Sequence, residues 1–166
     1  MVVLDHSLDP LGAGFQQSRS LLAIGSGQLT GQGYLNGTQT QASYSAALPA
    51  RQTDFIFSVC GGELGMVGCL LLLLVLALII LRCCWVGRNA SSPFSAYVSM
   101  GIAGMLLAQV FINVGMCLYI LPVMGLTLPF FSYGGSSIIT LYTAMGIVSS
   151  IRARTLPSWL RDRNQL

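Results

Sequence analysis

Residues 64–86 read LGMVGCLLLLLVLALIILRCCWV, and this stretch decides the fold class of the chain. No charged residue occurs in it before Arg82. A helix needs about 20 apolar residues to cross the hydrocarbon core of a bilayer, so the stretch predicts a membrane-spanning helix. Charged residues make up only 8% of the whole chain, whereas soluble domains usually carry about a quarter. The composition therefore places the chain among membrane proteins.

Two further apolar stretches follow, at 97–121 and 131–151, and each is long enough to span. The polar turn 87–93 separates the first span from the second. The link 122–129 contains proline and glycine, so neither neighbouring helix can continue through it. We therefore predict an all-α polytopic membrane protein. Its three transmembrane helices are preceded by a long extracytoplasmic loop region with short interfacial helices.

Arginine placement predicts how this bundle is oriented. Arg82 and Arg88 flank the first turn, and four more follow the last span: Arg152, Arg154, Arg161 and Arg163. Short flanks rich in arginine stay in the cytoplasm. We therefore expect residues 1–62 to form an extracytoplasmic region, 63–152 a three-helix bundle and 153–166 a cytoplasmic tail. Residues 1–60 and the link 122–130 should then lie on the same outer side.

One carboxylate, Asp54, lies just ahead of the first apolar run, within the string TDFIF at 53–57. A carboxylate at the boundary between water and lipid has two common uses. It is either a solvated flank that caps the helix, a role that Thr53 would fill equally well, or a catalytic group acting on a lipid-anchored substrate. The orientation predicts that Asp54 meets the link 122–130. Glu63, at the start of the span, suits the helix dipole in a structural role.

Other polar residues offer weaker candidates. Gln109 and Asn113 lie one helical turn apart in the second span, where hydrogen bonds between helices are the ordinary reason for amides and substrate contact is the alternative. A glycine pair with hydroxyls at a helix start either binds an anion such as pyrophosphate or caps the helix. That candidate group comprises Ser132, Tyr133, Gly134, Gly135, Ser136 and Ser137. Arg19 and Arg51 either pair with phosphate or are solvated loop charges.

Two other classes of function find little support. All eight basic residues are arginines, and they do not cluster with aromatic residues as a nucleic-acid-binding surface would require. The five cysteines show no spacing typical of metal ligands. We therefore expect no nucleic-acid partner and no structural metal centre built on cysteine.

Several motifs occur in an order that resembles one family. They are DPLGAGFQ at 9–16, QS at 17–18, AIGSG at 23–27, GTQTQ at 37–41, TDFIFSV at 53–59, ELG at 63–65, FINVGM at 111–116 and LPFFSYGGSS at 128–137. Together they resemble the SEDS family (shape, elongation, division and sporulation), which comprises RodA, FtsW and SpoVE. The GTQTQ string and residues 121–123 are more similar to RodA.

The resemblance implies a fragment from the C-terminal part of a peptidoglycan glycosyltransferase, containing the last large outer loop and the final three spans. Such an enzyme sits in the bacterial plasma membrane and polymerises lipid II, a polyprenyl-pyrophosphate-linked disaccharide-peptide, for cell-wall elongation, cell shape or division. The resemblance also implies a monofunctional class B penicillin-binding protein as partner. Asp54 matches the essential aspartate of the family.

The implied reaction is an inverting glycosyl transfer, in which Asp54 acts as general base or as ligand of a divalent cation, Mg or Mn. The chain departs from the family at Ala50, Gln52 and Gly62, where the family usually has Glu, His and Glu, so three of the usual polar or charged groups around the expected site are absent. A lipid II flippase is one alternative, although no charged residue lies in 64–81 or in the expected spans 97–121 and 131–151. An inactive truncated remnant that serves only as a membrane interaction module is the other.

Overall fold

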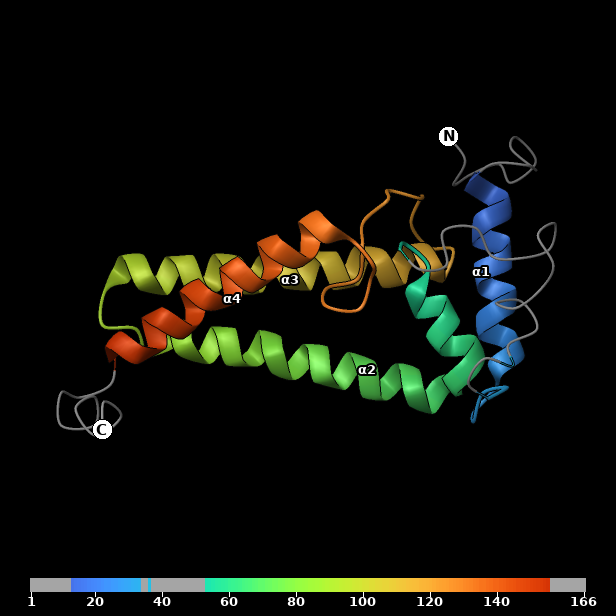
Figure 1. Ribbon diagram of the computed structural model, residues 1–166, viewed down its shortest axis with the longest axis horizontal. Helices are drawn as coiled ribbons and strands as arrows, with labels where there is room; N and C mark the ends of the chain where they lie inside the picture. Colours follow the sequence, from blue (N-terminus) through green and yellow to red (C-terminus); the bar gives the residue numbers. More distant parts are fainter. Residues whose placement is uncertain (1–12, 34–35, 37–52, 156–166) are drawn as a thin grey trace.

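The computed structural model describes residues 13–33, 36 and 53–155, and the secondary structure within them is helical (Figure 1). The helices are α1 (Ala13–Gly27), α2 (Ile56–Arg88), α3 (Pro93–Cys117) and α4 (Gly135–Thr155). Helices α2, α3 and α4 lie lengthwise beside one another, and α1 runs across one end of them. The chain therefore forms a bundle with a crossing helix at one end.

Two of the described helices are long and apolar enough to cross a membrane, α2 with 33 residues and α3 with 25. Both begin before the expected starts at 64 and 97. Helix α4 begins at Gly135 rather than at 131, because residues 128–132 form a turn in which the Ser132 amide donates to the Leu128 carbonyl at 3.2 Å. Helix α1 has 15 residues and lies in the region where short interfacial helices were expected.

The packing of α2 separates a narrow buried stripe from a broad exposed surface. Leu72 and Leu76, one turn apart, are 3% and 2% exposed, whereas Leu71 and Leu74 are 64% and 58% exposed. Among the described residues, two apolar clusters lie along the bundle, one around Phe55, Leu72 and Leu128 and one around Val86, Leu106 and Val148. Exposed leucines on this scale suit a lipid environment rather than water.

Helix α2 is broken at Gly65, where φ is 69° and ψ is −167°. Only glycine adopts this combination readily. The segment 28–33 supplies partners for the main-chain groups freed on both sides of the break. The amides of Gln32 and Gly33 donate to the carbonyls of Gly62 and Glu63 at 3.0 Å, and the amides of Met66 and Val67 donate to the carbonyls of Gln28 and Leu29 at 3.0 and 3.3 Å.

Glycines allow the backbones to approach closely at this break. A Cβ at Gly31, where φ is 80°, would overlap the Glu63 carbonyl, and a Cβ at Gly27 would overlap the Gly61 carbonyl. As a result, residues 56–64 form an arm at a steep angle to the rest of α2, the teal segment in Figure 1. The arm packs against α1. It positions Asp54, which lies two residues before the arm, near the end of α3.

We predict that Gly65→Ala destabilises the folded chain by about 2 kcal/mol or more, because a side chain is strained at this φ and ψ and would sit 2.6 Å from the Leu29 carbonyl oxygen. Thermal unfolding in detergent micelles measures the effect. The matched control is Gly104→Ala in α3, where a Cβ meets open space and alanine favours the helix. Equal midpoints for both variants would contradict the role given to Gly65.

Candidate functional site

The site is built around Asp54, which lies two residues before α2 and is partly exposed. Asp54 does not cap the helix, because the N-cap is Phe55 and no side chain makes the capping hydrogen bond. Its carboxylate lies beside the link between α3 and α4, where a Cβ on Gly125 would be 3.8 Å from Asp54 Oδ2. The predicted meeting of Asp54 with the link 122–130 is therefore observed.

Asn113 of α3 fixes the main chain around the carboxylate. Its side chain is fully buried, and Nδ2 donates to the carbonyl oxygens of Asp54 at 2.9 Å and of Leu126 at 2.6 Å. One turn further along α3, Cys117 Sγ also lies 3.9 Å from the Asp54 carbonyl. Asn113 was expected to join helices, but it joins α3 to two non-helical segments and so holds Asp54 against the link.

Helix α1 ties the same region together through polar side chains that sequence reasoning missed. Gln17 Nε2 donates to the Leu121 carbonyl at 2.5 Å, and Ser20 Oγ donates to the Cys117 carbonyl at 2.8 Å. Ser20 and Ser58 share a further hydrogen bond of 2.5 Å between their hydroxyls. Recognition of α1 as a full helix would have placed Gln17 and Ser20 on one face.

The glycine- and hydroxyl-rich segment lies at the start of α4. Ser132 is buried, and its Oγ accepts from the Leu128 amide at 2.8 Å, so this hydroxyl closes a turn. Ser137 Oγ donates to the Gly134 carbonyl at 3.0 Å. Tyr133, Gly135 and Ser136 are exposed at or beside the first turn. The hydroxyls of Ser132 and Ser137 therefore serve the local fold, and the exposed residues are what the segment offers to a ligand.

The remaining predicted residues are spread out. Arg19 lies on α1 with its guanidinium 5.1 Å from the ring of Phe15, and Arg51 falls outside the described residues. Glu63 is buried within the arm of α2 rather than in its first turn, and its carbonyl accepts from Gly33. Gln109 keeps a buried Oε1 with no hydrogen-bond partner, as does Asn113 at Oδ1.

The described part of the chain contains no group of three or more His, Cys, Asp or Glu side chains able to hold a metal ion. Asp54 would be a single ligand in such a site. The divalent cation therefore stays a prediction from the chemistry, and no step of the reaction is derived through it.

We expect Asn113→Leu to lower the free energy of unfolding by about 1 to 3 kcal/mol, because two buried carbonyls lose their donor. Gln109→Leu makes the same change one turn away but removes an oxygen that has no partner, so it should be neutral or stabilising. Thermal unfolding compares the two, and proteolysis of residues 118–134 should become faster only in Asn113→Leu. A larger loss of unfolding free energy in Gln109→Leu than in Asn113→Leu would refute the role given to Asn113.

The chain has relatives among known proteins. The family model described as cell cycle protein, covering FtsW, RodA and SpoVE, matches residues 1–156. The chain is 48% identical over 151 residues to the peptidoglycan glycosyltransferase MrdB of Escherichia coli K12, which covers 91% of this chain and 40% of the relative. It is 41% identical over 143 residues to the stage V sporulation protein E of Bacillus subtilis, covering 86% of the chain and 38% of that protein.

A solved structure shares the fold. It was described as showing the structural coordination of polymerization and crosslinking by a peptidoglycan synthase complex, and it superposes with a TM-score of 0.76 at 32% sequence identity. The match covers 95% of this chain and 41% of the other. The chain thus spans about 40% of the length of the relatives that it matches.

Proposed function

This chain belongs to the family of cell cycle proteins that includes FtsW, RodA and SpoVE, and from that premise we propose that it forms the C-terminal part of a peptidoglycan glycosyltransferase. Its substrate is lipid II, polymerised into glycan strands, and Asp54 is its catalytic group. One observation carries the assignment of Asp54. Its main chain is held by a buried amide from α3, while its carboxylate remains partly exposed beside a glycine.

In this proposal Asp54 accepts the proton of the acceptor sugar hydroxyl. The hydroxyl oxygen attacks the anomeric carbon of the lipid-linked donor, the bond from that carbon to the pyrophosphate oxygen breaks, and polyprenyl pyrophosphate leaves with inversion. A base must come within hydrogen-bond reach of the hydroxyl, so a fixed main chain at Asp54 favours the reaction. Gly125, at φ 65°, presents backbone without a side chain on the side of the carboxylate.

The negative charge of the leaving pyrophosphate must be stabilised by cations or by main-chain N–H groups that point toward it. We assign this role to the N-terminus of α4, a helix of 21 residues whose first two residues, Gly135 and Ser136, are exposed. Arg19 and Arg51 are the cations of residues 1–60 that remain candidates for the same charge. Ser132 and Ser137 would support this segment through the turns that they close.

The proposed setting is the bacterial plasma membrane, with α2, α3 and α4 as three spans. Helix α4 has 21 residues, which gives it a length of about 30 Å, enough to cross the hydrocarbon core. Ile139 and Tyr142 are 70% and 67% exposed along it, as lipid-facing residues would be. Asp54 then lies outside and the arginine-rich end inside, so the site meets a substrate whose head group is extracytoplasmic.

The similarity to the peptidoglycan glycosyltransferase MrdB favours the same reaction, and the similarity to a complex for polymerization and crosslinking favours a crosslinking partner. We propose that this partner is a monofunctional class B penicillin-binding protein. Polymerised strands emerging near Asp54 would then reach a crosslinking domain on the same side of the membrane.

A chimera tests the function directly. This chain replaces the corresponding C-terminal part of the Escherichia coli relative, and glycan polymerisation from lipid II is measured in reconstituted membranes. We predict polymerisation by the chimera and a loss of about 100- to 10,000-fold in Asp54→Asn, as expected when a general base is removed. Asp162→Asn in the tail is the matched control and should keep the rate. A folded chimera that polymerises equally well with Asn at 54 would sink the proposal.

A further inference from the structure

The end of the bundle opposite Asp54 collects positive charge. There α2 ends, α3 begins and α4 ends (Figure 1). Between residues 64 and 155 the sequence contains four arginines, Arg82, Arg88, Arg152 and Arg154, and no Asp or Glu. Within the described part of the chain, none of these four arginines has a carboxylate partner. This basic end therefore presents cations that the helices themselves do not neutralise.

Aromatic residues at the basic end mark the level of a membrane surface. The guanidinium groups of Arg82 and Arg152 lie 4.6 and 4.7 Å from the ring centre of Trp85, which joins α2 to α4. On the first turns of α3, Phe94 and Tyr97 are 76% and 77% exposed. Aromatic and arginine side chains gather at this depth because they place apolar parts in lipid and polar parts among head groups.

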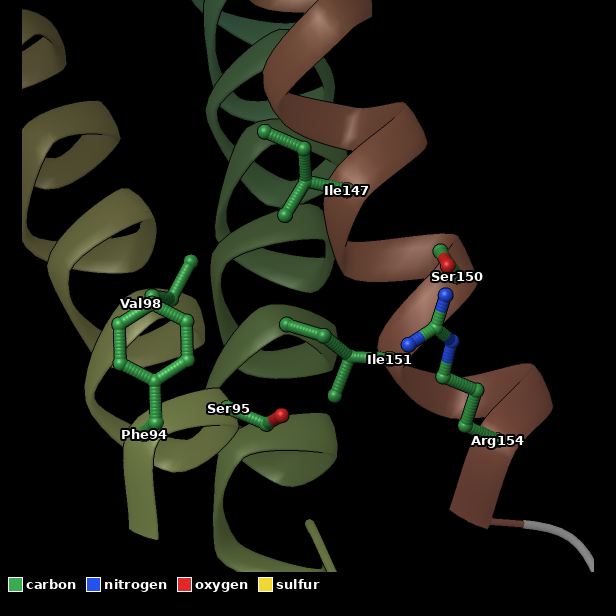
Figure 2. Close-up of a pocket in the computed structure, with 7 residues that line it drawn as sticks. All are labelled: Phe94, Ser95, Val98, Ile147, Ser150, Ile151 and Arg154. Carbon is green, nitrogen blue, oxygen red and sulfur yellow. The ribbon is translucent and has the colours of Figure 1, made fainter. Parts of the chain in front are cut away.

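A hollow of about 270 Å³ lies between α3 and α4 at this end (Figure 2). Its lining comprises Phe94, Ser95, Val98, Ile147, Ser150, Ile151 and Arg154. Ile147 and Ile151 project from α4 toward α3, and the Arg154 guanidinium lies beside Ser150 one turn earlier on the same helix. The hollow thus has apolar walls and a cationic, hydroxyl-bearing edge.

We propose that this hollow binds an anionic phospholipid from the membrane. The phosphate binds Arg154 with help from the hydroxyls of Ser150 and Ser95, and an acyl chain lies along the apolar walls. Arg152 is engaged with Trp85, so Arg154 is the cation left for a ligand at this position. A guanidinium offers a planar set of donors that matches two phosphate oxygens at once.

The chemistry of the lining separates a lipid from other occupants. Free phosphate would leave the apolar walls uncovered, since the side chains of Phe94, Val98, Ile147 and Ile151 have no polar atoms to offer it. A purely apolar helix would leave the guanidinium of Arg154 without an anion. A lipid with a phosphate head and an acyl tail satisfies both parts of the hollow.

Native mass spectrometry of the full chain released from detergent tests the proposal. It compares retained phosphatidylglycerol with phosphatidylcholine of the same acyl chains. We expect phosphatidylglycerol to be retained preferentially, and Arg154→Gln to weaken its binding about tenfold, as the loss of a charge-assisted hydrogen bond would. Arg88→Gln removes the same charge from the same end without lining the hollow, and should change binding less than twofold.

Four outcomes would overturn the proposal. Equal losses in Arg154→Gln and Arg88→Gln would show attraction to the basic end as a whole rather than binding in the hollow. Equal retention of phosphatidylcholine would show that the phosphate charge is not recognised. Displacement of the lipid by millimolar inorganic phosphate would point to a soluble anion. Val98→Phe partly fills the hollow without touching any charge, and it should also weaken phosphatidylglycerol binding; unchanged binding in that variant would place the lipid elsewhere.

Discussion

Four main-chain hydrogen bonds between residues 28–33 and the two sides of Gly65 hold α2 in its broken shape. A helix interrupted near a membrane exposes amides and carbonyls, and each of these groups costs several kcal/mol if it is left unpaired in lipid. The segment that follows α1 supplies all four partners, so the break becomes a stable feature. The arm 56–64 can then turn away from the span. Asp54, which precedes the arm, reaches the end of α3 because of this turn.

The polar side chains at that end fix the main chain, and Ser20 in addition shares a hydrogen bond with the hydroxyl of Ser58. Asn113, Gln17 and Ser20 all donate to carbonyl groups of non-helical or helix-terminal residues. Such donors hold irregular backbone where no regular secondary structure is available to pair it. The result is a partly exposed carboxylate on a fixed main chain, a requirement that any role as a base places on Asp54. The opposite end of the bundle has a different character, with cations and aromatic side chains at its surface.

The sequence was most informative where a single physical requirement dominates. The run at 70–81 is too apolar to be anything but a span or a core helix, and the arginine distribution correctly brought Asp54 to the link 122–130. It was least informative about Asn113, because its two partners lie 59 and 13 residues away and only the folded chain brings them together. The arm of α2 was missed for a similar reason. Gly61 and Gly62 weaken a helix by propensity, and only the contact with α1 explains why the helix continues through them.

We propose that the position of the Asp54 carboxylate, and not merely its charge, serves polymerisation. Asp54→Glu tests this most directly, because it keeps the charge and the main-chain bond from Asn113 but moves the carboxylate by one methylene group. In the chimeric enzyme we predict a fall in polymerisation rate of about 100-fold, since a displacement on the order of 1 Å has that effect on a positioned catalytic group. A rate equal to that of the unaltered chimera would contradict the claim and return Asp54 to the role of a solvated flanking charge.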